Sequence, residues 1–205
     1  VWDGKEMVSV QCTGEVILSA GSIGTPQILQ LSGIGSREVL QQHGIPVVHE
    51  LSGVGENLQD HLQIRSVYKV KSPNGKDISL NTKAKSIWGK TKMAVEYAFK
   101  QTGPLSMAPS QLGAFTRSSP NQQYPNIQYH VQPLSLDAFG EPLHDFPAFT
   151  ASVCNLNPTS RGHVHLKSGN FKDAPNIVTN YLSTEYDRQI AVESLRMTRK
   201  IVAQS

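Results

Sequence analysis

The stretch from Glu15 to Gly35, EVILSAGSIGTPQILQLSGIG, limits most strongly what this chain can fold into. It opens with three apolar residues, Val16 to Leu18, the pattern of a strand that is buried on both faces. The next four residues are small, Thr25 is a suitable N-cap and Pro26 suits a first helical position, so a short helix ending at Gly33 is expected. A phosphate or a dinucleotide can lie against the backbone at such a turn. An ordinary strand–turn–helix of an α/β core carries the same pattern.

Further elements are expected on both sides of this stretch. Residues 1–12 read as a hairpin, and Ser36 can cap a second short helix that Gly44 ends. From residue 62 on, polar and apolar residues mix in short segments between loops, which favours an antiparallel sheet. Its strands are expected at residues 62–70, 111–117, 126–131, 149–156 and 163–166, with a turn at residues 72–75.

Two longer helices are expected in the second half of the chain. The first covers residues 86–100, where aromatic side chains recur at helical spacing and are expected in the core: Trp88, Tyr97 and Phe99. The second is capped by Ser183 and continues toward the end of the sequence.

Composition excludes several classes of protein. The net charge over 205 residues is only +3, and lysine and arginine are scattered, so nothing indicates nucleic-acid binding. No apolar run approaches the length of a membrane span. Cys12 and Cys154 lie far apart, which favours free thiols over a disulfide and therefore a reducing, cytoplasmic location. The start at Val1 suggests a chain cut from a larger protein.

Three motifs in this order resemble the GMC (glucose–methanol–choline) oxidoreductases, FAD-dependent enzymes that oxidise alcohols. Residues 22–35 resemble the second signature of the family, and residues 53–61, GVGENLQDH, are similar to the segment that lies over the flavin. Residues 158–166, PTSRGHVHL, resemble a strand of the substrate domain. The resemblance implies a mixed α+β and α/β fold. One part belongs to an FAD-binding α/β domain, and the other is a substrate domain with an antiparallel sheet flanked by helices. The implied divisions are residues 1–61 for the flavin domain, 62–174 for the substrate domain and 175–205 for a helix returning to the flavin domain.

The resemblance also implies which residues bind FAD: Ala20, Gly21, Gly24, Asn57, Asp60 and His61. The first three are small residues at the turn, and the resemblance puts Ala20 and Gly21 near the adenosine side of the cofactor. Tight packing between a strand and a helix would select the same small residues. The last three belong to the lid over the flavin, although asparagine and aspartate also bond to local backbone in ordinary loops.

Gln63 and His130 are the candidates for the substrate pocket. Choline-oxidising members of the family place a carboxylate just after the Asp-His pair, whereas this chain has Gln63 there and no acid, which weakens a choline assignment. His130 shares a strand face with two glutamines, and a polar surface strand is the simpler explanation for both candidates. His163 and His165 share a face as well, but no further ligand cluster accompanies them, so no metal site is expected.

These observations lead to a hypothesis about function. No Gly-x-Gly-x-x-Gly motif stands between a strand and a helix, and the resemblance places that motif upstream of this sequence and the catalytic histidine downstream. The chain is therefore interpreted as the central portion of an FAD-dependent alcohol or choline dehydrogenase-like enzyme, inactive alone, whose substrate is a small alcohol. The isolated portion is expected to self-associate through its exposed strand. The alternative is a non-catalytic α/β binding module on the same scaffold.

Overall fold

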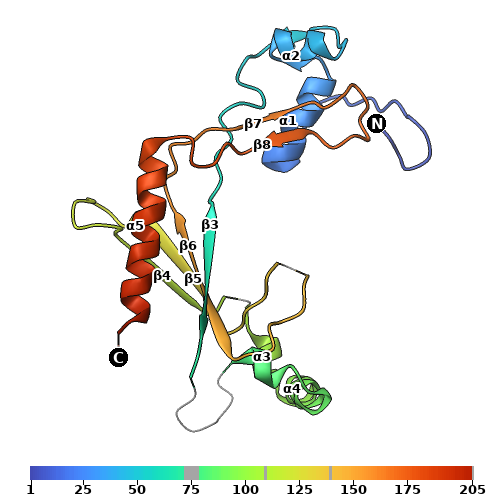
Figure 1. The fold of residues 1–205 in the computed structure, drawn as a ribbon. Helices are drawn as coiled ribbons and strands as arrows, with labels where there is room; N and C mark the ends of the chain where they lie inside the picture. The colour runs from blue at the N-terminus through green and yellow to red at the C-terminus, as the bar shows by residue number, and fades with distance from the viewer. Residues whose placement is uncertain (72–78, 109, 139, 205) are drawn as a thin grey trace. The chain divides into compact units, whose positions relative to one another are not determined.

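The computed structural model describes residues 1–71, 79–108, 110–138 and 140–204 (Figure 1). Its contacts divide the chain into two units. The first unit combines Val1–Leu58 with Arg161–Thr179, and the second combines Gln59–Ser160 with Asn180–Ser205. The expected turn at residues 72–75 lies outside the described residues.

The first unit holds short elements around one helix: α1 (Gly21–Leu31), β1 (Ile34–Gly35), α2 (Arg37–Gln42), β2 (His49–Glu50), β7 (His163–His165) and β8 (Asn176–Val178). Strands β1 and β2 pair in parallel, and β7 and β8 pair antiparallel. The chain leaves α1 through Gly33, whose φ of +79° suits glycine, and a Cβ there would lie 2.4 Å from the Pro46 carbonyl oxygen. The expected end of α1 and the expected second helix are confirmed.

Gln30 ties α1 to β7. Its side chain is fully buried, and it donates from Nε2 to the Val164 carbonyl oxygen at 2.9 Å. Its Oε1 accepts from the Leu166 backbone N–H at 3.0 Å. One glutamine thus satisfies a donor and an acceptor on the edge of β7, as buried backbone groups require.

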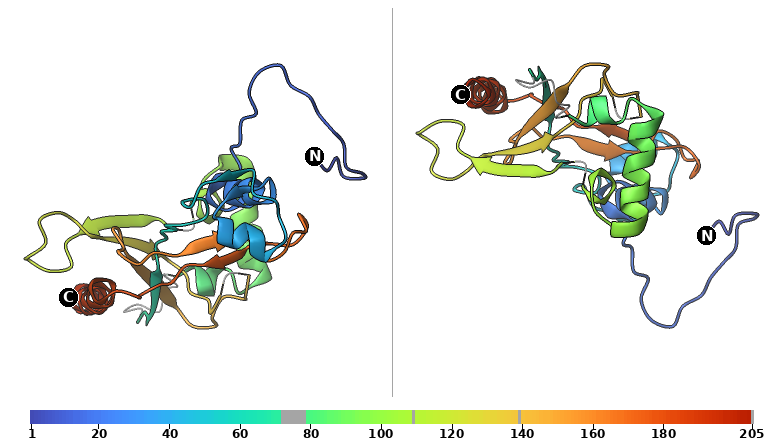
Figure 2. Two further views of the ribbon diagram at one scale, coloured as in Figure 1. Left: turned by 90° about the horizontal axis from the view of Figure 1, so that it is seen from above. Right: turned by 90° about the horizontal axis from the view of Figure 1, so that it is seen from below.

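The second unit is built on a four-stranded antiparallel sheet in the order β3-β6-β5-β4. The strands are β3 (Gln63–Lys69), β4 (Leu112–Thr116), β5 (Ile127–Gln132) and β6 (Ala148–Asn155), and the helices are α3 (Leu80–Lys83), α4 (Ile87–Lys100), the 3-10 turn η1 (Pro104–Ser106) and α5 (Glu185–Val202). Figures 1 and 2 show α5 running alongside the sheet. The expected mixed fold, with an antiparallel sheet and flanking helices, is confirmed.

One face of the sheet packs on α5 and forms the core. Ile127, Tyr129 and Val153 from the sheet meet Ile190 from α5, and all four side chains are buried. The Tyr129 hydroxyl lies 3.0 Å from the Thr198 Oγ1, so the polar end of the ring also finds a partner. The other face of the sheet therefore carries the alternate residues of each strand.

The expected strand at Val16–Leu18 is wrong for this structure. These residues form no strand, and Val16 and Ile17 are 76% and 81% exposed. Residues 8–20 contain no strand, and Figure 2 shows the start of the chain as a long loop that includes them. A strand that is apolar on both faces needs neighbouring strands and covering helices, and the described chain places none beside it.

Helix α1 also begins earlier than expected. It starts at Gly21 with Ala20 as N-cap, so Thr25 lies inside the helix rather than at its cap. The Thr25 Oγ1 accepts from the Ala20 backbone N–H at 3.1 Å, which bonds the start of the helix from within its second turn. Thr184, not Ser183, caps α5. The opening hairpin is reduced to a single bridge between Trp2 and Met7.

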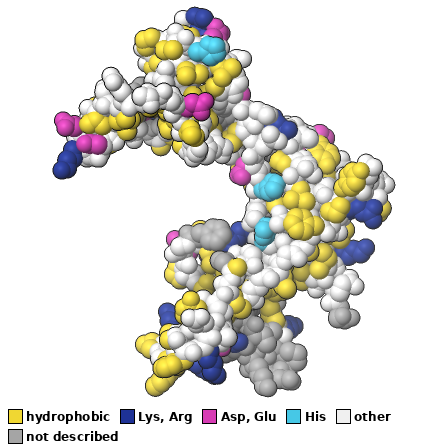
Figure 3. Space-filling view, turned by 180° about the vertical axis from the view of Figure 1, so that it is seen from behind, with side chains coloured by type: hydrophobic (Ala, Val, Ile, Leu, Met, Phe, Trp, Pro, Cys, Tyr) yellow, Lys and Arg dark blue, Asp and Glu magenta, His cyan; other side chains and the backbone are white. Residues whose placement is uncertain are grey.

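Two other expectations differ from the structure because they depend on distant partners. Residues 163–166 do not join the large sheet, since β7 pairs with β8 in the first unit. The aromatic side chains of α4 are not in a core. Trp88 and Phe99 are 84% and 85% exposed, and Tyr97 is 44% exposed. The space-filling view likewise shows hydrophobic side chains on the surface (Figure 3).

Candidate functional site

The start of α1 presents an open stretch of backbone. Ala20 and Gly21 are exposed, and no side chain caps the helix in the described structure. Gly21 has a φ of +75°, and no atom lies within 4 Å of the position that a Cβ would take. Tight packing therefore does not explain Gly21, and the open space fits a cofactor that approaches the backbone closely. Gly24 is different, because a Cβ there would lie 3.0 Å from the Ala20 Cβ, so local packing already requires a small residue.

The segment that precedes β3 is anchored at Leu58. Its backbone exchanges two hydrogen bonds of 2.9 Å with Gly162, and Gly55 lies so close to β7 that a Cβ would meet the Val164 carbonyl oxygen at 2.3 Å. Between these anchors Asn57 is exposed with a φ of +63°, a conformation that asparagine tolerates better than most residues. The anchored loop thus holds the Asn57 side chain at the surface of the first unit.

Asp60 and His61 lie in the second unit and have partners within it. The Tyr181 hydroxyl donates to Asp60 Oδ2. His61 Nε2 lies 3.0 Å from the Leu156 carbonyl oxygen, which can only accept, so Nε2 carries the proton in this contact. For these two side chains the structure supports a role in fixing the loop, and Asn57 is the lid candidate without such a contact among the described residues.

The structure brings Gln63 and His130 to the same face of the large sheet, opposite the core. Gln63 pairs with Cys154, and His130 pairs with Ser152, which in turn pairs with Arg65 on β3. We call this surface the polar sheet face; its residues are Gln63, Arg65, Gln128, His130, Gln132, Thr150, Ser152 and Cys154. Sequence reasoning missed Arg65 and Ser152, because alternation places Arg65 with Gln63 but does not say which strand lies beside them.

The polar sheet face is partly tied together by hydrogen bonds. Arg65 Nη2 donates to Gln132 Oε1 at 3.3 Å, and the Thr150 hydroxyl donates to the Leu134 carbonyl oxygen at 2.8 Å. Burial raises the pKa of the Cys154 thiol above its ordinary value, so this thiol stays protonated near neutral pH. The four strands of the described sheet contain no aspartate or glutamate. The formal charges that the strands themselves bring to this face are therefore positive.

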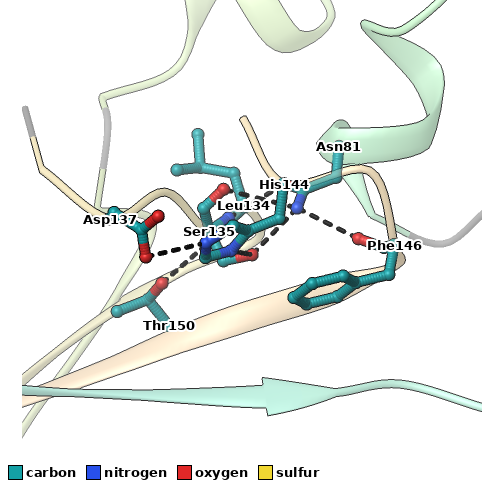
Figure 4. A network of polar contacts seen from close by, with 7 residues as sticks. All are labelled: Asn81, Leu134, Ser135, Asp137, His144, Phe146 and Thr150. Atoms are coloured by element: carbon teal, nitrogen blue, oxygen red, sulfur yellow. Dashed lines mark hydrogen bonds and ion pairs between the residues drawn. The ribbon is translucent and has the colours of Figure 1, made fainter. Parts of the chain in front are cut away.

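A serine, a histidine and an aspartate meet beside the sheet without forming a catalytic triad (Figure 4). His144 lies 2.9 Å from the Ser135 Oγ and 3.1 Å from Asp137 Oδ1. Ser135 is completely buried and also accepts from Asn81 Nδ2 at 2.8 Å, whereas the Asp137 side chain is 91% exposed. A working triad needs an accessible serine and a buried acid, which is the opposite arrangement. The network joins α3 to the loop between β5 and β6.

The carboxylate of Asp187 anchors the segment that leads into β7 from the second unit. It accepts from the Thr159 and Ser160 backbone N–H groups at 2.9 and 2.8 Å and from Asn155 Nδ2 at 3.2 Å. Burial alone would raise the pKa of Asp187, but the hydrogen bonds from Ser160 and Thr159 outweigh it and hold the pKa below its ordinary value. The carboxylate is therefore charged at neutral pH and has a structural role.

The described residues contain no group of three side chains that could hold a metal ion. His163 and His165 stack with their ring centroids 4.1 Å apart, and His165 Nε2 contacts Glu56 Oε1. In the same part of the chain, no helix is long and apolar enough to cross a membrane.

Comparison with known proteins identifies the family to which the chain belongs. Models described as GMC oxidoreductase match residues 3–63 and 158–205, together more than half of the chain. An oxygen-dependent choline dehydrogenase from Pectobacterium carotovorum subsp. carotovorum is 40% identical over 201 residues, covering 98% of this chain and 35% of that protein. The enzyme of the same name from Photobacterium profundum is 41% identical over 201 residues, covering 98% of this chain and 34% of that protein. The chain thus spans about a third of the length of these relatives.

Solved structures agree with this result. Formate oxidase superposes with a TM-score of 0.78 and 26% identity over 90% of this chain and 36% of its own. An FAD-dependent oxidoreductase from Chaetomium thermophilum superposes with a TM-score of 0.76 and 24% identity, over 98% of this chain and 40% of its own, and shows the shared fold. Sequence motifs, fold and relatives lead to one family, and the chain belongs to the GMC oxidoreductases.

Proposed function

We propose that this chain forms the central part of an FAD-dependent oxidoreductase that acts on the CH–OH group of a small alcohol. The observation that carries the proposal is the open backbone at Gly21, within the segment that matches the family. A second support is the polar sheet face, which offers hydrogen-bonding side chains opposite a well-packed core.

The two units suggest a division between cofactor binding and substrate binding. We assign the flavin-binding part to the first unit and the substrate-binding part to the second. This differs from a division at residues 61 and 174, since β7 is bonded to α1 through Gln30 and α5 completes the core of the large sheet. In this assignment Ala20, Gly21, Gly24 and Asn57 contact FAD, while Asp60 and His61 hold the start of β3 in place.

The chemistry of the reaction comes from the flavin when it is bound: the alcohol loses its hydroxyl proton to a base and a hydride to the flavin, leaving a carbonyl. The residues of this chain bind and orient the cofactor and the alcohol. Gln63 and His130 can each donate and accept a hydrogen bond, so either of them can hold a hydroxyl group on the polar sheet face. The described residues give no base a defined place in this reaction.

The test uses the complete protein that carries this sequence. We expect it to purify with FAD, and we expect an anaerobic panel of small alcohols to bleach its flavin absorbance near 450 nm, roughly the usual flavin maximum. Absence of flavin together with no reduction by any alcohol would favour the non-catalytic binding module. The free thiols Cys12 and Cys154 suit a cytoplasmic location, which cell fractionation of the same protein tests.

A further inference from the structure

We propose that the substrate alcohol carries an apolar tail, and that an apolar pocket beside α3, α4 and η1 binds this tail. The inference rests on the proposed function and narrows its substrate class to alcohols with a hydrocarbon chain or ring. All residues that line the pocket belong to the second unit, so its walls are defined within one compact part of the chain.

The pocket is large enough for a small hydrocarbon group. Its volume is about 270 Å³. Large apolar side chains form most of its wall: Leu80, Met93, Leu105, Met107, Leu134 and Leu143. A cavity of about 150 Å³ with such a lining binds benzene, so this pocket has room for an aromatic ring or for a chain of about six carbons. The two methionine side chains are flexible and can adapt to either shape.

Local contacts hold the walls of the pocket in place. The Leu80 backbone N–H donates to the Pro133 carbonyl oxygen at 2.8 Å, which joins α3 to the segment after β5. At the other wall, Gly103 has a φ of +81° and lies against α4, so that a Cβ there would be 2.6 Å from the Glu96 Cδ. The fold itself therefore forms the pocket, and a ligand that enters it pays little for ordering the surrounding chain.

The chemistry of the lining favours a hydrocarbon over a charged group. None of the described residues that line the pocket is charged, and none is aromatic. Gln111 is the polar side chain among them, and its Nε2 donates to the Met107 Sδ. A charged group would lose its hydration in the pocket without gaining a partner. A quaternary ammonium needs a carboxylate or an aromatic cage, and the described lining offers neither.

The rim of the pocket provides polar groups for the hydroxyl end of the alcohol. Gln111 is exposed, and its backbone N–H donates to the Val131 carbonyl oxygen at 3.1 Å, so it lies beside β5. Two residues further on, Gly113 pairs with His130 and places no side chain over it. Two residues of strand and one strand spacing separate the Cα atoms of Gln111 and His130, roughly 8 Å. A hydroxyl group between these two side chains can belong to an alcohol whose tail fills the pocket.

The first measurement is a series of alcohols with the complete flavin-loaded protein. From ethanol to hexanol, kcat/KM should rise about three- to fourfold per methylene, which is the gain from burying one CH₂ group, and it should level off once the pocket is full. Dimethylbutanol, the uncharged isostere of choline, should be a better substrate than choline. Hexyl methyl ether has the same chain as hexanol but no hydroxyl group. It should inhibit hexanol oxidation competitively and raise the Tm, because it binds the folded protein.

Two variants change the pocket itself. Ala84→Leu adds bulk to its wall, and Leu105→Ala removes an exposed apolar side chain from its rim. Both should lower the ratio of kcat/KM for hexanol to kcat/KM for ethanol, roughly 10-fold or more for Ala84→Leu and about 3- to 10-fold for Leu105→Ala. Both should also reduce the rise in Tm that the ether causes. The matched control is Ala94→Leu, since Ala94 is exposed on α4 outside the pocket and its replacement should leave the ratio unchanged. Thermal melting without ligand checks that each variant keeps its fold.

The possible results separate the two proposals. If no alcohol reduces the flavin, the proposed function fails, and the effect of the ether on the Tm then decides by itself whether the pocket binds a hydrocarbon. If the flavin is reduced but kcat/KM does not depend on chain length, or both pocket variants behave like Ala94→Leu, the enzyme assignment stands and the pocket inference is overturned. A preference for choline over dimethylbutanol would overturn it as well.

Discussion

At the scale of single residues, Gly21 combines two properties that can be tested separately. Its backbone is in the left-handed region with φ of +75°, and the space beside it is open. An L-residue with a branched side chain pays about 1–2 kcal/mol for that backbone conformation. Asparagine tolerates it better, yet still places a side chain where the cofactor is proposed to lie. Gly21→Asn in the complete protein should therefore lower the flavin-to-protein absorbance ratio with little loss of stability, and Gly21→Val should lower both.

Gly44 supplies the matched control for this residue. Its φ is +68°, and nothing lies within 4 Å of the position of its Cβ, but it ends α2 and is not placed at the flavin. Gly44→Asn and Gly44→Val should reproduce the stability changes while leaving the flavin ratio normal. A normal ratio in Gly21→Asn and Gly21→Val would remove the cofactor role of Gly21.

At the scale of elements, local patterns were predictable from the sequence and pairings were not. Helix α4 begins where expected because Ser86, its N-cap, accepts from the Gly89 backbone N–H at 2.9 Å, a signal contained in four consecutive residues. Alternation likewise located the strands of the large sheet. The place of β7 depends on β8 and on Gln30, which is more than 100 residues away, and no periodicity reports such a contact. For the same reason Gln63 and His130 were found singly, whereas their common face with Arg65 needed the register.

The hydrogen bonds at the start of α5 predict how the stability of the fold depends on pH. The hydrogen bonds of Ser160 and Thr159 hold the pKa of Asp187 below its ordinary value of 3.8 in the folded chain. A carboxyl group with a lowered pKa stabilises the fold above its unfolded pKa, and that stability is lost as the pH falls through the folded value. Asp187→Asn should cost roughly 2–3 kcal/mol near pH 7, because an amide cannot accept from all of these donors.

Urea unfolding of the second unit, followed from about pH 7 down to about pH 3, measures this effect. As the pH falls, the free energy of unfolding should decrease less in the Asp187→Asn variant than in the unmodified chain. Asp145→Asn is the control, since Asp145 is exposed and has no bond or ion pair among the described contacts. Equal behaviour of the two variants would contradict the role of Asp187 at the helix start.

At the scale of the whole molecule, the two units should differ in their resistance to opening. In the second unit, the two central strands of the sheet, β5 (Ile127–Gln132) and β6 (Ala148–Asn155), are each paired with a neighbouring strand on both sides. Their backbone amides can therefore exchange only when the whole unit unfolds. Val16–Leu18 has no ladder partner in the described structure and exposes apolar side chains, which favours association with another chain. Hydrogen exchange on the 205-residue chain should therefore be slowed by a factor of roughly 10³ or more in β5 and β6 relative to an unfolded chain, whereas residues 16–18 should be nearly unprotected.

Light scattering at rising concentration should show self-association, and Ile17→Lys should reduce it without changing exchange in β5 and β6. Equal protection of both regions in a monomer would mean that residues 16–18 have found a strand partner within the chain.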